Sequence, residues 1–376
     1  MTTPIDPRQR ARARRAAGVV ADFDGDRLAL GRRLRGIPRT RLAEQVEVSA
    51  AAITQFERGD ARPTSPVLAA IALALHFPRE FFLRGAAIQR IPTSAAYFRS
   101  LRSTSALTRD QALAFAELAS AVVDVMEQYV ELPAIKVPTH PVEELLNTDD
   151  VAAAAAAARR ELGVGSGPIG HVVRTMEAAG IVVLELPVDY DTARGLDAFS
   201  THHTARPIAL LSDNKQDKAR SRFDAAHELG HLVMHPDAEP GSKLMEDDAH
   251  AFAAQFLAPD AELLPDLPTR FEWGPLLELK RHWGISIKSI SYRAHKSGQW
   301  TDAQYRRAMQ TLASDGRVER GSLGPREEPA MLGRAATLIE EAGWDLDEIA
   351  DSCQLPTAAF RQVIFAGSER RPRLSL

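Results

Sequence analysis

Apolar residues recur at helical spacing along most of the chain, and three short segments carry strand-like runs instead. Residues 27–84 read as a string of short helices, and residues 109–132 predict one long helix with a broad apolar face. The positions that close two short helices over a shared core in the first region are Leu42, Val46, Val48, Ile53 and Phe56. The chain is therefore expected to be mainly α-helical.

The strand-like runs lie in the middle of the chain, at residues 180–186, 198–201 and 208–211. Each is short and rich in β-branched or other apolar residues, which favours strands over helices. Helices are predicted before them, at residues 151–162 and 169–179. These segments predict an α+β domain with a small sheet, and an edge of that sheet could hold a peptide by strand addition.

A helix with two histidines is predicted at residues 222–235. His227 and His231 stand four residues apart, so both imidazoles lie on one face of a helix, one turn apart. The flanking positions are apolar, and Pro236 marks the expected end. Two such imidazoles can share a metal ion, and Glu228 between them can act as a general base on a water molecule. The alternative is a histidine pair that only stabilises the fold.

The third ligand that a catalytic zinc needs is expected from the next helix, which begins at residue 246. Its apolar positions recur at helical spacing, and it stops before Pro259. Glu246 is the best candidate and Asp248 the next, while His250 is expected to orient a ligand without binding the metal. The alternative is an acidic first turn that only complements the helix dipole.

These two helices and the strand before them resemble the ImmA/IrrE family of metallopeptidases, over roughly residues 150–300. The resemblance implies a zincin-like fold in which two histidines and a downstream acid hold the metal. It also implies action on helix-turn-helix repressors, as in known members. The implied ligands are His227, His231 and Glu246, and the ion is zinc, although manganese also suits this set. His250 departs from the family, which more often has Asn or Asp there.

Charge is unevenly distributed between the amino-terminal segment and the rest of the chain. Residues 1–84 hold 15 arginines, no lysine and 9 acidic residues, which gives a net charge of +6. Because the whole chain carries −4, the remaining residues sum to −10. An arginine-rich head on an acidic body indicates nucleic acid as a partner of the amino-terminal part.

The sequence from Thr40 to Gly59 resembles the XRE-type helix-turn-helix of phage repressors, whose second helix enters the major groove of double-stranded DNA. Ser49 is the expected N-cap of that helix. Glu47 occupies the turn, where the family usually has glycine, and a left-handed backbone there would cost roughly 1 kcal/mol. The residues expected on the DNA-binding face are Arg39, Ser49, Ala50, Ala51, Thr54, Gln55, Arg58 and Arg62. A helical interaction module that no longer binds DNA is the alternative.

Composition narrows the class of protein further. The only cysteine is Cys353, so neither an internal disulfide nor a thiolate-rich zinc site can form. No stretch approaches a membrane span, and the start lacks the apolar core of a signal peptide. We therefore expect a cytoplasmic protein without a membrane partner.

These patterns together predict a multi-domain chain. Its expected segments are a basic flexible arm (1–26), an all-α helix-turn-helix domain (27–84), a helical connector (85–145), a metallopeptidase domain (146–300) and a C-terminal helical domain (301–376). The connector helix could form a homodimer contact, because such regulators usually read two half-sites, or it could pack within the chain. The C-terminal part resembles a degenerate helix-turn-helix, for which packing or protein recognition is expected.

The expected function is that of a DNA-binding transcriptional regulator with a zinc-dependent endopeptidase domain. The peptidase would cleave a repressor, either its own chain or a partner, in a stress or phage-related response. The alternative is a transcription factor whose metallopeptidase-like domain senses a metabolite or a metal without cleaving.

Overall fold

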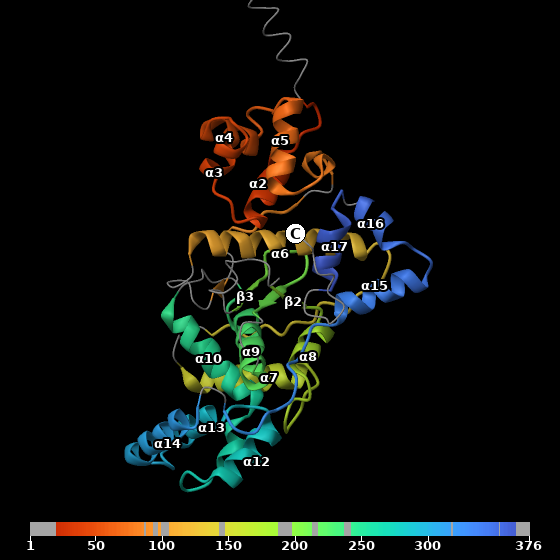
Figure 1. The fold of residues 1–376 in the computed structure, drawn as a ribbon. Coiled ribbons are helices and arrows are strands. Elements are labelled where there is room, and N and C mark those ends of the chain that lie inside the picture. The colour runs from red at the N-terminus through yellow and green to blue at the C-terminus, as the bar shows by residue number, and fades with distance from the viewer. Residues whose placement is uncertain are drawn as a thin grey trace, which may run out of the picture.

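A mixed sheet divides the molecule into two hydrophobic cores, called here the upper and the lower core after their places in Figure 1. The computed structural model describes residues 20–85, 88–92, 97–98, 105–142, 147–186, 198–212, 217–236, 242–316, 319–352 and 354–365. Helices predominate in this part of the chain, which confirms the predicted fold class. Most of the predicted basic arm and Cys353 lie outside the described residues.

The strands follow the order β1-β3-β4-β2 across the sheet. β2 (Val182–Glu185) is parallel to β4 (Ile208–Leu211), and β3 (Ala198–Thr201) is antiparallel to β4. These three lie where the sequence predicts strands. β1 (Tyr97–Phe98) pairs antiparallel with the other edge of β3; the sequence does not predict it, because two residues are too few for a periodic pattern.

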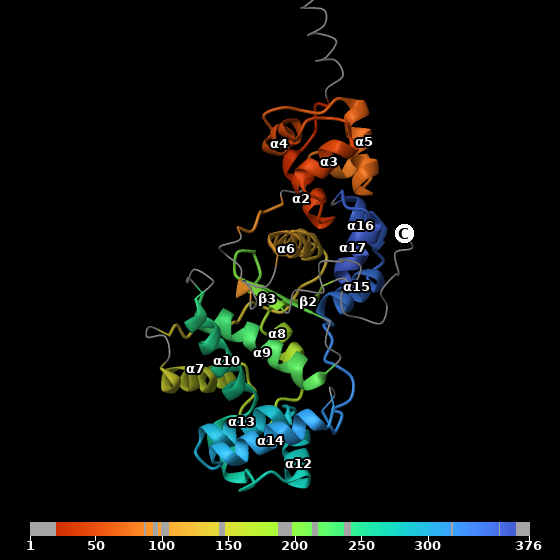
Figure 2. The same cartoon turned by 60° about the vertical axis from the view of Figure 1, so that its left-hand side comes forward.

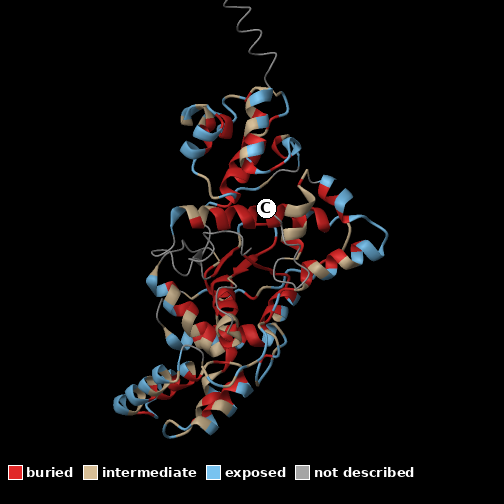
Figure 3. Ribbon diagram, in the orientation of Figure 1, coloured by how far each residue is buried: buried red, intermediate tan, exposed pale blue. Residues whose placement is uncertain are grey.

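Successive residues of each strand face opposite cores. In β2, Val182 and Leu184 belong to the upper core, whereas Val183 belongs to the lower core. In β4, Leu210 faces up and Ala209 faces down. Figure 3 shows the sheet buried on both sides. Because helices cover both faces, the strands read as continuous apolar runs and not as alternating ones.

The amino-terminal helices lie at the top of the molecule. They are α2 (Gly25–Leu34), α3 (Arg39–Gln45), α4 (Ala50–Arg58), α5 (Ser65–Leu75) and the 3-10 turn η1 (Arg79–Phe82). Glu47, between α3 and α4, has a φ of 54°, which confirms the predicted left-handed turn. The Ser49 hydroxyl accepts a hydrogen bond from the N–H of Ala52 at 3.1 Å, which confirms the predicted N-cap of α4.

α6 (Ala106–Met126) crosses the molecule between these helices and the sheet (Figures 1 and 2). Leu113, Phe115 and Val122 of its apolar face are 0% exposed. They belong to the upper core together with residues of the amino-terminal helices, the sheet and the C-terminal helices. Of the two uses that the sequence allows for this face, the structure shows packing within the chain.

The helices of the lower core lie on the other side of the sheet, below it in Figure 1. They are α7 (Thr148–Glu161), α8 (Val172–Ala178), α9 (Lys218–Met234), α10 (Lys243–Leu257), α11 (Asp260–Leu263), the 3-10 turn η4 (Leu264–Asp266), α12 (Trp273–Trp283), α13 (Ile287–Lys296) and α14 (Asp302–Ser314). α9 packs on β3 and β4, and α10 packs on both α7 and α9. α9 is therefore enclosed between the sheet and other helices.

Residues 301–376 divide between the two cores, which differs from the single unit that the sequence predicts. Ala308 of α14 packs in the lower core, whereas α15 (Met331–Glu341), α16 (Leu346–Ser352) and α17 (Thr357–Ile364) pack in the upper core. Helical periodicity shows that a face is apolar but not which core it meets. The segment that links the two parts is held by Glu327, which forms a buried ion pair with Arg222 at the start of α9.

The turn between α16 and α17 repeats the turn between α3 and α4. Gln354 has a φ of 54°, the same as Glu47. The N–H of Leu355 donates to the carbonyl oxygen of Ala350 at 3.0 Å, as that of Val48 donates to Ala43 at 3.0 Å. α17 packs against α6, so this second helix-turn-helix contributes its second helix to the interior. None of the helices in the described residues has the length and apolar character that a membrane span requires.

Candidate metal centre and DNA-binding face

α9 carries both histidines through the lower core. Its N-cap is Asp217, whose carboxylate accepts a hydrogen bond from the N–H of Arg220 at 2.8 Å. The helix ends with His235 as its C-cap, just before Pro236 as the sequence predicts. His227 and His231 are both 0% exposed. Polar rings buried this deeply need hydrogen-bonding or metal partners.

α10 brings a carboxylate to the same place. Its N-cap is Ser242, and Glu246 lies in its first turn. The two helices approach closely at Gly230, where an added Cβ atom would lie 2.9 Å from Cδ1 of Phe252. This close approach lets the Glu246 side chain reach α9.

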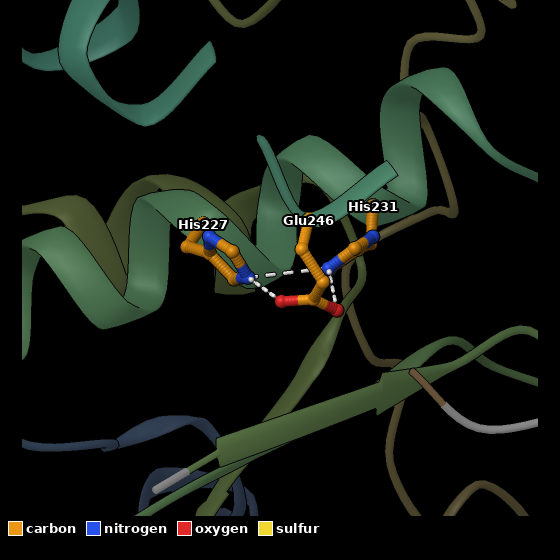
Figure 4. Close-up of side chains that lie close together, drawn as sticks. All are labelled: His227, His231 and Glu246. Carbon is orange, nitrogen blue, oxygen red and sulfur yellow. Dashed lines mark hydrogen bonds and ion pairs between the residues drawn. The ribbon is translucent and has the colours of Figure 1, made fainter. Parts of the chain in front are cut away.

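The three side chains converge, as Figure 4 shows. The Nε2 atoms of His227 and His231 lie 3.2 Å apart. Glu246 lies against both, with Oε2 3.3 Å from the Nε2 atom of His227 and Oε1 3.4 Å from that of His231. The structure thus brings together the three residues that the sequence proposes as metal ligands.

The separation of the two histidine nitrogens fits a tetrahedral metal ion. Zinc bonds of about 2.0–2.1 Å place the ligand atoms of a tetrahedral site about 3.3 Å apart. One ligand atom from each of the three residues lies within 4.8 Å of the others, and the two histidine nitrogens can both turn lone pairs toward one cation. The set is consistent with zinc, and its two imidazoles and one carboxylate leave a fourth position for water or substrate.

The protein environment holds Glu246 in the charged form that a metal ligand requires. Burial by itself would raise the pKa of this carboxyl group. Hydrogen bonds from His227 and His231, and the charge of these rings when protonated, outweigh burial and lower the pKa of Glu246 far below its ordinary range. The carboxylate is therefore ionised at neutral pH.

Three further residues lie around this triad. His250 contacts the ring of His227 with ring centroids 4.6 Å apart, and its Nδ1 atom lies 2.6 Å from the Glu246 carbonyl oxygen. Asp248, the second candidate ligand, instead faces His235, with Oδ2 and Nε2 4.0 Å apart. The sequence gives no role to His235, although its spacing of four residues from His231 is the signal that could have revealed one.

Glu228 lies between the two histidines in the sequence and is 0% exposed. Its backbone carbonyl oxygen accepts a hydrogen bond from the Ser200 hydroxyl of β3 at 3.3 Å. In the sheet, Ser200 pairs with Tyr97 of β1. The edge of β3 that faces away from β4 is therefore paired with β1, a segment of the chain itself, and not with an added peptide strand.

The DNA-binding face that the sequence predicts is at the surface of the amino-terminal helices. Ser49, Ala51, Gln55, Arg58 and Arg62 are exposed, and the remaining members of the set are exposed or half-buried. The structure adds internal contacts for some of them. The Thr54 hydroxyl donates to the Ala50 carbonyl oxygen at 3.0 Å, and Arg62 donates to that of Ala21 at 2.6 Å.

Glu57 is a structural residue that the sequence does not single out. Its buried carboxylate accepts hydrogen bonds from the guanidinium groups of Arg32 at 2.5 Å and Arg39 at 2.6 Å. Arg32 is buried, whereas the Arg39 side chain is 44% exposed. Glu57 therefore joins α2 to α4 and fixes the orientation of one arginine on the predicted DNA-binding face.

Comparison with protein families agrees with this geometry. Residues 176–295, which include all three triad residues, match the family described as the IrrE N-terminal-like domain. Residues 25–81 match the family described as a helix-turn-helix domain. The chain combines a helix-turn-helix DNA-binding domain with an IrrE N-terminal-like metallopeptidase domain. No curated protein matches the chain.

The two domains define the kinds of partner. A helix-turn-helix domain implies DNA, and a peptidase domain implies a protein substrate. The IrrE N-terminal-like domain contains a cluster of two histidines and a glutamate that suits a metal ion. The chain thus has the domain architecture of a regulator, in which a DNA-binding domain is joined to a domain of metallopeptidase type.

Proposed function

We propose that this protein is a cytoplasmic transcriptional regulator whose zinc-dependent endopeptidase domain cleaves a helix-turn-helix repressor. The observation that carries the proposal is the triad of His227, His231 and Glu246, with Glu228 on the same buried helix, in a chain that also has a DNA-binding domain. The cleaved repressor is either this chain or a partner protein, in a stress or phage-related response.

The residues divide the chemistry among them. His227, His231 and Glu246 would hold the ion. Zinc supplies Lewis acidity at such a site, which lowers the pKa of a water molecule and polarises the scissile carbonyl group. Glu228 takes a proton from the attacking water and passes it to the amine that leaves. His250, beside the His227 ring, keeps that ligand in place.

The DNA-binding half would act as a repressor or an activator at a double-stranded operator. In this proposal Ala50, Ala51, Thr54 and Gln55 face the bases, and Arg39, Arg58 and Arg62 contact phosphates, with Ser49 at the amino end of the reading helix. Because the α6 face is buried within the chain, a homodimer on two half-sites would form through another surface.

The second candidate is a regulator whose metallopeptidase-like domain senses a metal or a metabolite and cleaves nothing. The sensor needs the three ligands but not Glu228. A Glu228→Gln variant therefore separates the two, because it removes the general base and leaves the ligands unchanged.

The experiment compares wild type and Glu228→Gln in cells, with a reporter of regulation and a mass-spectrometric survey of new protein amino termini. Cleavage predicts a new terminus in a helix-turn-helix protein in the wild type only, together with loss of regulation in the variant. Regulation that survives in Glu228→Gln without any difference in new termini would contradict cleavage and favour the sensor.

A further inference from the structure

His231 has different partners on its two ring nitrogens. Nε2 lies in the triad, 3.2 Å from Nε2 of His227 and 3.4 Å from the Glu246 carboxylate. Nδ1, on the opposite side of the ring, lies 3.2 Å from Nδ1 of His235. His235 in turn has its Nε2 atom 4.0 Å from Oδ2 of Asp248. A line of polar groups thus leads from the triad to a carboxylate on α10.

Proton placement along this line follows from the contact between the two rings. Only one proton fits between two ring nitrogens 3.2 Å apart. A neutral His231 that turns the lone pair of Nε2 to a metal carries its proton on Nδ1, so it donates to Nδ1 of His235. His235 then carries its own proton on Nε2, on the side of Asp248.

The side chains along this line are buried. His231, His235 and Asp248 are 0%, 3% and 2% exposed, so water from outside does not compete for these groups. A buried carboxylate is costly unless a donor faces it, and Asp248 faces the proton-bearing side of His235. Glu246 and Asp248 both lie on α10, so this helix supplies both the proposed metal ligand and the carboxylate that faces His235.

We propose that His235 and Asp248 are positioning residues, which fix the ring orientation and the tautomer of His231 for metal binding without contacting the metal. The inference rests on the metal site of the proposed function. Histidine ligands generally donate their second N–H to such an acceptor, and loss of the acceptor typically weakens metal binding 10- to 100-fold. Here the acceptor is a second histidine, whose Nε2 atom faces the Asp248 carboxylate at 4.0 Å.

A simpler role for His235 is that of a helix end. Its backbone N–H donates to the His231 carbonyl oxygen at 3.0 Å and terminates α9. That hydrogen bond is made by the backbone and therefore remains whichever side chain stands at residue 235. Substitutions that differ only in the side-chain acceptor therefore separate the two roles.

The test measures zinc affinity, by competition with a chromophoric chelator, for the full-length wild type and single variants. His235→Phe fills the space without an acceptor, His235→Asn keeps an oxygen near the position of Nδ1, and Asp248→Asn removes the charge. His282→Phe, an exposed histidine on α12, is the matched control. The visible spectrum of the cobalt-substituted proteins reports ligand geometry independently of activity.

The proposal expects zinc affinity to fall 10- to 100-fold in His235→Phe, to fall less in Asp248→Asn, and to stay within about three-fold of wild type in His235→Asn and His282→Phe. The cobalt spectrum should shift in His235→Phe. Wild-type affinity and spectrum in His235→Phe, with zinc lost in His227→Ala, would overturn this inference and leave the proposed function standing. Should His235→Phe fail to fold, wild-type affinity in Asp248→Asn overturns it instead. A wild type that binds no zinc would overturn the proposed function and this inference together.

Discussion

Gly230 of α9 lies against the side chain of Phe252 of α10, and a Cβ atom at residue 230 would stand 2.9 Å from Cδ1, 3.2 Å from Cγ and 3.3 Å from Cβ of that side chain. The close atoms include the base of the ring, which cannot swing aside as the end of a flexible chain could. The distance between the two helices at the metal centre is therefore set by the absence of a side chain at residue 230.

Gly230→Ala should destabilise the protein and weaken zinc binding together. Alanine favours a helix over glycine by roughly 1 kcal/mol, but crowding of a packed core costs about 1–3 kcal/mol and pushes away the helix that carries Glu246. Urea unfolding and zinc competition measure the two effects. Gly274→Ala on α12 is the control, because nothing lies within 4 Å of its new Cβ atom. A gain of stability in Gly230→Ala equal to that in Gly274→Ala would contradict the packing argument.

Glu57→Gln should destabilise the amino-terminal domain by about 3–5 kcal/mol, because it leaves the buried guanidinium of Arg32 without a counter-charge. The measurement is the free energy of unfolding in urea at neutral pH. Glu44→Gln, an exposed acid on α3, should change it by less than about 0.5 kcal/mol. Equal effects of the two variants would show that the buried ion pair contributes no more to the free energy of unfolding than an exposed acid does.

Glu47→Gly should stabilise the same domain by roughly 1 kcal/mol. The backbone φ of 54° at this position is strained for glutamate, whereas glycine adopts it freely. The counterpart is Gly59→Ala, at the left-handed C-cap of α4 with a φ of 75°. This substitution should lower the free energy of unfolding by a similar amount. Both are read as shifts of the urea midpoint. If Glu47→Gly lowers the midpoint, the strain at this turn is smaller than the flexibility that glycine adds to the unfolded chain.

Arg58→Ala should weaken binding to DNA of any sequence and reduce the salt dependence of the binding constant by about one counter-ion, since the residue is expected at a phosphate. Fluorescence anisotropy on a mixed-sequence duplex at several salt concentrations measures both quantities. The control is Arg281→Ala, at an exposed arginine of α12, a helix outside the amino-terminal domain. The same loss in both variants would mean that net charge alone, and not the helix-turn-helix face, determines binding.

Local signals explain why so much of the structure follows from the sequence. Ser49 caps its helix through a hydrogen bond to the residue three positions later. His227 and His231 share a helix face because they are four residues apart. Both features therefore depend only on residues that are close in the sequence. Glu246 could be proposed because it lies at the start of the next predicted helix, one turn before His250. Its contact with both histidines agrees with that prediction.

Contacts between distant segments are what the sequence does not reveal. Arg32 and Glu57 meet across two helices, and Arg222 and Glu327 meet although 105 residues separate them in the sequence. No periodic pattern links such pairs, because their approach depends on how the helices pack. The same reason hides the pairing of Tyr97 with Ser200. His235 is the exception, since it stands one turn after His231 and could have been noticed.

The metal content of the purified protein shows whether His227, His231 and Glu246 hold an ion. Wild type, His227→Ala and Glu246→Ala are purified without chelators and analysed by inductively coupled plasma mass spectrometry, with circular dichroism as the check on folding. We predict about one equivalent of zinc in the wild type and little in either variant, with all three folded. A folded wild type without bound metal, or folded variants that retain zinc at the wild-type level, would contradict it.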